Sequence, residues 1–109
     1  MRKLRPRKRA LKLAAQVRER ISDALGHPVK VILYGSQARG DAKKDSDIDL
    51  LVVLPSVTKD TRKLVSEIAW EVGFDAGKVI STIPTTDAEI KYYAILPFFK
   101  SVKQEGITV

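Results

Sequence analysis

The sequence predicts a mixed α/β (α+β) domain in which a small mixed β-sheet is flanked by helices. Two observations support this fold class. Segments with apolar residues at helical spacing alternate along the chain with short segments rich in β-branched residues. The length of 109 residues allows one hydrophobic core but not two, and contents of 44% hydrophobic and 30% charged residues are typical of a globular protein.

The first helix and the first strand are predicted in the amino-terminal third of the chain. A helix is expected over residues 10–25 and should end at Gly26, because apolar residues recur there at helical spacing: Leu13, Val17, Ile21 and Ala24. Residues 29–34 (VKVILY) are rich in β-branched residues and stop at Gly35, which predicts a strand. Residues 37–46 are polar, and we expect a helical beginning and a turn at their end.

A second strand and a second long helix follow. Residues 48–54 are almost entirely apolar and are closed by Pro55, as expected of a strand in the core. Residues 60–72 carry apolar residues on one helical face, which predicts an amphipathic helix. The Asp-Ala-Gly sequence at residues 75–77 predicts a turn after this helix.

The last third of the chain predicts a third strand and two short helices. The strand is expected over residues 78–83 (KVISTI) and should end at Pro84. A threonine followed by acids predicts a capped helix over residues 86–93. A further helix is expected over residues 97–105, before Gly106.

The net charge of +7 is concentrated at the amino terminus. Residues 1–9 contain no acid and hold six of the 20 basic residues: Arg2, Lys3, Arg5, Arg7, Lys8 and Arg9. The other 14 basic residues are balanced by 13 acidic ones, so we divide the chain into a basic tail (residues 1–9) and one domain (residues 10–109). The tail either contacts RNA, DNA or an acidic protein face, or is a solvated terminus.

Cysteine is absent, which excludes disulfides, thiolate metal sites and a cysteine nucleophile. The longest uninterrupted apolar run covers residues 50–54, far below the ~20 residues that a membrane span needs. Charges follow the basic amino terminus every few residues, which argues against a secretory signal. We therefore expect a cytoplasmic protein without a membrane partner.

Two carboxylates stand at the start of the second predicted strand. Asp47 and Asp49 are two positions apart, so their side chains share one face of the strand, with Cα atoms roughly 7 Å apart. Carboxylates this close repel each other unless a cation lies between them. Mg²⁺ is bound by one or two carboxylates together with substrate phosphates. The pair therefore predicts a magnesium site.

A Gly-Ser pair ends the first predicted strand. Gly35 lets a ligand approach the backbone, and Ser36 offers a hydroxyl and an N–H group where a helix can begin, which suits a phosphate. Arg39 adds positive charge three residues later, and Gly40 permits a sharp turn. Together with the carboxylate pair, these residues predict a site for a nucleoside triphosphate and its metal ion.

The segment GSQARGDAKKDSDIDLLVV resembles the signature of the DNA polymerase β-like nucleotidyltransferase superfamily. Gly35-Ser36 is followed, after ten residues, by Asp47-Ile48-Asp49. More narrowly, the segment looks like the minimal nucleotidyltransferases, which are standalone domains of about this length. The segments IPTTDAE and PFFKSVKQEGI also look like the carboxy-terminal end of that group, so the resemblance covers nearly the whole chain. It implies the palm-like fold of that superfamily.

The resemblance also implies a reaction. Asp47 and Asp49 would be the catalytic metal ligands for Mg²⁺, and Gly35, Ser36 and Arg39 would bind the triphosphate of ATP. A nucleoside monophosphate, expected to be AMP, would pass to a hydroxyl acceptor. Many minimal nucleotidyltransferases resemble antitoxins that transfer AMP to a tyrosine of a small helical HEPN-domain toxin. The resemblance therefore implies such a partner and an antitoxin role.

The sequence departs from the superfamily pattern on the third strand. Members usually carry a third carboxylate there, but residues 78–83 contain no acid, and Ser81 would take its place. Asp75 precedes this strand and Asp87 follows it, so either would have to reach into the site. The alternative function is therefore a catalytically weak nucleotide-binding module that neutralises its partner by forming a complex.

Aromatic residues lie outside the signature. Trp70 is on the second long helix, and we expect it to pack in the core rather than stack on a substrate. The pairs Tyr92-Tyr93 and Phe98-Phe99 are expected in the core or at an interface with a partner.

Overall fold

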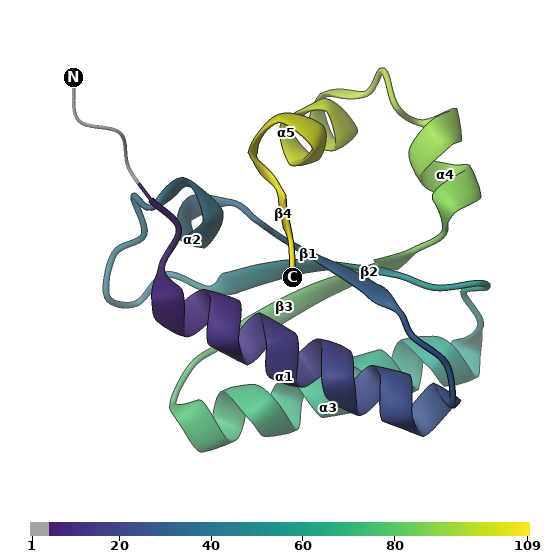
Figure 1. Cartoon of the computed structure of the whole chain (residues 1–109), viewed down its shortest axis with the longest axis horizontal. Coiled ribbons are helices and arrows are strands. Elements are labelled where there is room, and N and C mark those ends of the chain that lie inside the picture. Colours follow the sequence, from purple (N-terminus) through teal and green to yellow (C-terminus); the bar gives the residue numbers. More distant parts are fainter. Residues whose placement is uncertain (1–4) are drawn as a thin grey trace.

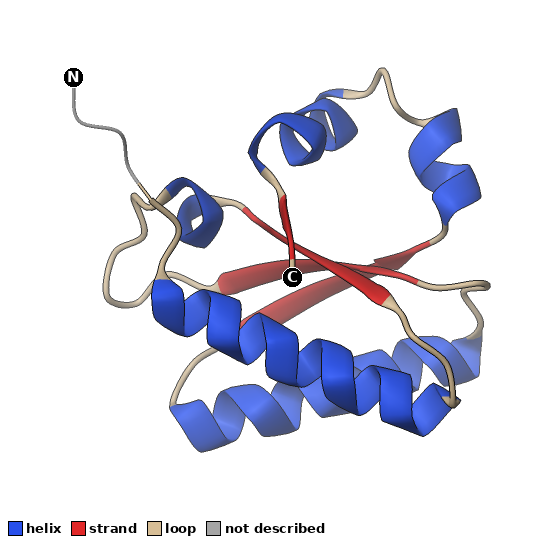
Figure 2. Ribbon diagram, viewed as in Figure 1, coloured by secondary structure: helices blue, strands red, loops and turns tan. Residues whose placement is uncertain are grey.

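A computed structural model describes residues 5–109 as a four-stranded sheet with helices on both sides (Figure 1). In chain order the elements are α1 (Lys8–Leu25), β1 (Lys30–Tyr34), α2 (Ser36–Arg39), β2 (Ile48–Val53), α3 (Lys59–Ala76), β3 (Ile80–Thr85), α4 (Asp87–Tyr92), α5 (Pro97–Glu105) and β4 (Ile107–Thr108). The strands lie in the order β3-β2-β1-β4. β1 is antiparallel to β2 and β4, whereas β2 and β3 are parallel, so the predicted mixed sheet is confirmed (Figure 2).

The hydrophobic core lies between the sheet and the layer formed by α1 and α3 (Figure 1). Alternate residues of the central strands face this layer, and all of them are buried, among them Val31 and Leu33 of β1 and Ile48, Leu50 and Val52 of β2. The apolar stripe of α1, including Leu13, Val17 and Ile21, packs against them. The helices α4 and α5 lie on the opposite face of the sheet (Figure 1).

The amino-terminal helix begins at Lys8, two residues before the predicted start. Arg7 directly precedes it, and its backbone N–H donates a 2.9 Å hydrogen bond to the carbonyl of Gln37 in α2. Residues 5–9 of the predicted tail therefore contact the domain instead of extending away from it. Residues 1–4 lie outside the part of the chain that the structure describes. The predicted end of the helix at Gly26 is confirmed, because Gly26 adopts the left-handed conformation with φ 77°.

The bounds of α3 and β3 also differ from the prediction, since α3 extends past residue 72 and β3 begins at Ile80 rather than at residue 78. Asp75 and Ala76 form the last turn of α3, which Gly77 ends with φ 67°, so the predicted turn at residues 75–77 is wrong for its first two residues. β3 continues through Pro84 rather than ending at it. The carbonyl groups of Val79 and Thr85 accept hydrogen bonds from the N–H groups of Ile48, at the start of β2, and Leu54, directly after it. The nitrogen of Pro84 therefore points away from β2, where a strand loses no ladder bond.

The carboxy-terminal end closes the other edge of the sheet. The helix predicted over residues 97–105 is confirmed as α5, and Thr86 caps α4 by accepting a 3.1 Å hydrogen bond from the N–H of Glu89. The strand β4 was not predicted, because two residues carry no periodicity. It pairs Ile107 with Leu33 of β1. None of the helices in residues 5–109 has the length and hydrophobicity needed to cross a membrane, and the cytoplasmic location stays a prediction.

Candidate active site

Three neighbouring strands bring polar side chains together at one end of the sheet. Tyr34 of β1 pairs with Asp49 of β2, and Asp49 pairs with Ser81 of β3. Paired residues on neighbouring strands project to the same face, so these three side chains form a row. Ile48 precedes Asp49 and is buried in the core against the helical layer, so the row lies on the face away from α1 and α3.

One member of the predicted carboxylate pair, Asp49, belongs to this row, and the charge of the other, Asp47, acts on it. Asp49 is half-buried and Asp47, which directly precedes β2, is exposed. Burial raises the pKa of the Asp49 carboxyl, and the nearby charge of Asp47 raises it further, whereas Arg39 lowers it. A bound cation would relieve both unfavourable effects, and two carboxylates are the hard oxygen ligands that Mg²⁺ prefers. These residues therefore fit a magnesium ion.

Gly35 joins the Gly-Ser turn to the carboxylate pair. Its φ of 77° and ψ of −157° fall in a region that is essentially restricted to glycine. A Cβ at this position would lie 2.6 Å from Oδ2 of Asp49, which is too close for real atoms. Gly35 is therefore needed both for its backbone conformation and for its close approach to Asp49.

Ser36 opens α2, a single turn of helix directly after Gly35. The carbonyl of Ser36 accepts hydrogen bonds from the N–H groups of Gly40 and Asp41, at 2.9 and 3.1 Å, which end the turn. Gly40 has φ 89°, and a Cβ there would collide with the backbone carbonyl of Arg5. The amino-terminal segment therefore packs against the turn that carries the predicted phosphate-binding residues.

Arg39 forms ion pairs with two carboxylates. Its Nη1 lies 3.0 Å from Oε2 of Glu105 in α5, and its Nε lies 3.2 Å from Oδ2 of Asp41. The hydrogen bond to Glu105, followed by the one to Asp41, raises the pKa of the guanidinium. Arg39 thus lies close enough to influence Asp49, but a phosphate would have to compete with both of its present partners.

Tyr34 is a residue of the site that sequence reasoning missed. Burial raises the pKa of its hydroxyl to about 12, and the charge of Asp49 contributes to the shift. The ring of Phe98 in α5 meets the Tyr34 ring edge-on, with centroids 5.4 Å apart. The signal available in the sequence was the position of Tyr34 directly before the Gly-Ser pair. The tyrosine therefore links α5 to the carboxylate row.

Ser81, which we expected in place of the superfamily's third carboxylate, lies directly beside Asp49 in the parallel register. Asp75 lies in α3 and lines a cavity together with residues of α1. Asp87 follows the far end of β3, where its Oδ1 lies 3.5 Å from Nζ of Lys30. Neither acid joins the site, and residues 5–109 contain no group of three or more His, Cys, Asp or Glu side chains that could hold a metal ion.

A basic cavity of about 330 Å³ lies beside the loop that joins α2 to β2. Five basic residues contribute to its lining: Arg7, Arg9, Lys43, Lys44 and Lys78. Arg7 and Arg9 donate hydrogen bonds to the carbonyls of Ala42 and Ala76, both at 2.9 Å. Within the described part of the chain, no carboxylate forms a salt bridge with these five residues. Nucleic-acid contact through residues 1–9 stays a prediction.

Comparison with known families decides the identity. Residues 14–105 match the nucleotidyltransferase domain family. The chain belongs to this family. The match confirms the resemblance that the Gly-Ser and Asp-x-Asp segments indicated, and Gly35, Asp47 and Asp49 lie within the matched range of this nucleotidyltransferase domain.

A curated relative comes from Methanocaldococcus jannaschii and is named as a candidate protein adenylyltransferase. It is 35% identical to the nucleotidyltransferase domain in an alignment of 72 residues that covers 63% of this chain and 49% of that protein. The chain therefore spans about half the length of this relative.

Solved structures share the fold. A candidate nucleotidyltransferase from Sulfolobus solfataricus aligns with a TM-score of 0.62 and 23% identity, over 92% of this chain and 78% of that one. A toxin–antitoxin complex with AMP-PNP aligns with a TM-score of 0.58, and a variant of the toxin–antitoxin pair MntA-HpeT with 0.59. Both are 16% identical and cover 91% of this chain and 70% of theirs. These similarities confirm the predicted fold class.

Proposed function

We propose that this domain is a Mg²⁺-dependent nucleotidyltransferase that transfers AMP from ATP to a tyrosine hydroxyl of a small helical partner of the HEPN type, and thereby acts as an antitoxin. The observation that carries the proposal is the close approach of Gly35 to Asp49, where no Cβ can fit. It supports a site in which the backbone that holds the phosphates and the carboxylates that hold the metal act on one ligand.

Each residue of the site has a role in this proposal. Asp47 and Asp49 bind the metal ion, and Gly35 and Ser36 bind the triphosphate through the backbone and the hydroxyl. When bound, Mg²⁺ would supply charge neutralisation at the α-phosphate and orientation of the pyrophosphate leaving group. Arg39 would exchange Glu105 or Asp41 for a phosphate oxygen.

The comparisons support the choice of nucleotide and acceptor class. The relative from M. jannaschii is named as a candidate protein adenylyltransferase, which supports AMP as the transferred group and a protein as the acceptor. One structure with the same fold is a toxin–antitoxin complex with AMP-PNP, an analogue of ATP. The HEPN identity of the partner rests on the resemblance of the sequence to minimal nucleotidyltransferases.

The test is transfer of label from ATP, labelled at the α-phosphate, to the candidate partner in the presence of Mg²⁺. The Asp47→Asn/Asp49→Asn variant should lose labelling of the partner, because both metal ligands are gone. The matched control is Asp75→Asn/Asp87→Asn, which removes two exposed acids away from the row and should label normally. Undiminished labelling by the first variant would show that the site assignment is wrong.

A second candidate function is neutralisation of the partner by binding alone. The observation that favours it is Ser81 beside Asp49, where members of the superfamily usually carry an acid. This candidate predicts that Asp47→Asn/Asp49→Asn still neutralises the partner. The Ser81→Asp variant also helps to distinguish AMP transfer from neutralisation by binding. A higher transfer rate in this variant would mean that the missing carboxylate limits catalysis.

A further inference from the structure

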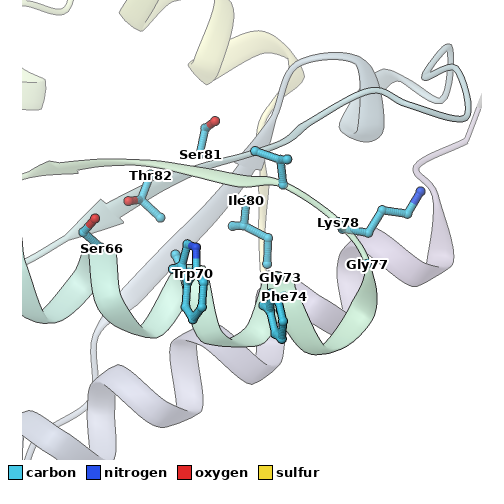
Figure 3. A pocket seen from close by; sticks show the side chains of 11 residues that line it. Ser66, Trp70, Gly73, Phe74, Gly77, Lys78, Ile80, Ser81 and Thr82 are labelled. Carbon is cyan, nitrogen blue, oxygen red and sulfur yellow. The ribbon is translucent and has the colours of Figure 1, made fainter.

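An apolar groove of about 690 Å³ runs between α3 and the outer edge of β3 (Figure 3). Trp70 and Phe74 of α3 form one wall, with their rings stacked at a centroid distance of 5.0 Å and an interplanar angle of 16°. Their side chains are 65% and 70% exposed, so the expectation that Trp70 packs in the core is wrong. Two adjacent exposed aromatic rings form a surface that a partner can cover.

The other wall of the groove is a strand edge with unpaired backbone groups. In residues 5–109, β3 lies at the end of the sheet and pairs with β2 alone. Because the carbonyls of Val79 and Thr85 accept hydrogen bonds from the start of β2 and the residue directly after it, the N–H and C=O groups of Ile80 and Thr82 point away from the sheet. These groups can pair with an added extended strand, and Pro84 limits that pairing to a short segment.

One face of the β3 edge meets the aromatic groove, and the other face meets the carboxylate row. The side chains of Ile80 and Thr82 point toward α3 and its aromatic pair, whereas Ser81 points to the opposite face (Figure 3). Ser81 lies beside Asp49 in the carboxylate row. An added strand alternates in the same way, so two of its side chains would enter the groove while the one between them lies over the face that carries Asp49.

The spacing between strands limits which side chain at the middle position of the added strand can reach the site. The added strand would lie about 4.8 Å from β3, and therefore about 10 Å from the backbone of Asp49. Serine or threonine is too short to cross Ser81 from there, whereas a tyrosine side chain is long enough to bring its hydroxyl over Ser81 toward the metal site. The small side chain of Ser81 leaves this path open.

From this geometry we infer that the β3 edge binds an extended segment of the acceptor protein in which apolar residues flank a tyrosine. The main chain of the segment pairs with Ile80 and Thr82, its apolar residues contact Trp70 and Phe74, and its tyrosine is the hydroxyl acceptor. This inference rests on the proposed function, because it describes how the acceptor reaches that site.

The first experiment measures binding of the acetylated and amidated peptide Ser-Val-Tyr-Val-Ser to the isotope-labelled full chain by NMR, without nucleotide. We expect chemical-shift changes at the amides of Ile80 and Thr82 and at the Trp70 indole. Trp70→Ala should weaken binding about tenfold or more, as for a central aromatic contact. The matched control Ile95→Ala removes an apolar residue that is 80% exposed outside the groove and should bind normally.

The second experiment tests the backbone pairing. Thr82→Pro removes an outward N–H and leaves the bonds to β2, as Pro84 already does two residues later, whereas Thr82→Val keeps that N–H. We expect Thr82→Pro to lose peptide binding and Thr82→Val to retain it. If Thr82→Pro does not fold, comparison of Trp70→Ala with Ile95→Ala still tests whether the peptide binds in the groove. Equal affinities across these pairs, or shifts confined to other surfaces, would overturn the inference.

Two further outcomes keep this inference separate from the proposed function. Peptide binding needs no nucleotide, so a wild-type chain that binds the peptide but fails to transfer AMP would contradict the proposed function alone. A dimer of the chain that Trp70→Ala dissociates, and that the peptide does not displace, would assign the groove to a second copy and overturn the inference.

Discussion

Replacement of Gly35 by alanine is expected to destabilise the domain and damage the site together. The backbone conformation of Gly35, φ 77° and ψ −157°, costs a residue with a Cβ on the order of 1–3 kcal/mol. In addition, the new Cβ would lie 2.6 Å from Oδ2 of Asp49, so the carboxylate or the turn must move. Because both effects act in the folded state, we expect the free energy of unfolding to fall by about 3 kcal/mol.

The assay is urea denaturation followed by circular dichroism, with Gly26→Ala as the matched control. Gly26 has the same φ of 77°, but a Cβ at this position would meet no atom within 4 Å, so its substitution carries only the left-handed cost of about 1 kcal/mol. The loss at Gly35 should shrink in an Asp49→Ala background, which removes the collision. Equal losses at Gly35 and Gly26, or no change with Asp49→Ala, would refute the steric argument.

Three further predictions concern the charges of the site. In metal-free protein the pKa of Asp49 is raised in the folded state, so the domain loses stability as the pH rises through that pKa and Asp49 becomes charged. Asp49→Asn, which carries no charge, should therefore stabilise the domain at neutral pH. The gain should shrink in acid, where burial and the charge of Asp47 no longer oppose a charged Asp49; thermal denaturation in EDTA across this pH range measures it, and a pH-independent effect contradicts it. The same variant should lower the pKa of Tyr34 from about 12, because the charge of Asp49 adds to the effect of burial, and an unchanged value in an NMR titration would attribute the shift to burial alone. Glu105→Gln should strengthen Mg-ATP binding by up to about fivefold in calorimetry, because it frees Arg39 from one carboxylate, whereas weaker binding would mean that the ion pair positions the arginine.

Most helix and strand positions could be predicted because their signals are local. Gly26 and Gly77 both follow the last turn of a helix and adopt the left-handed conformation that ends it. The failure at Pro84 has a tertiary cause, since proline is acceptable in a strand whose N–H groups point to a free edge, and the order of strands is not visible in the sequence.

The two halves of the site were predictable for a similar reason. Strand alternation places Asp47 and Asp49 on one face, and Gly35-Ser36 ends the preceding apolar strand. These local sequence patterns are enough to predict both pairs as site residues. Trp70 was misjudged because it lies outside the buried stripe of α3, on the side where β3 is the last strand of the sheet in residues 5–109, and the order of strands is not visible in the sequence.

By itself the sequence determined the fold class, the carboxylate pair and the glycine turn, because each depends on residues close together in the chain. Only the tertiary structure decided which side chains share the row with Asp49. Strand order and register placed Tyr34 and Ser81 beside it, and they left Asp75 and Asp87 elsewhere. Register depends on how whole faces of the sheet pack against α1 and α3, and that packing is a property of the assembled core rather than of any local segment.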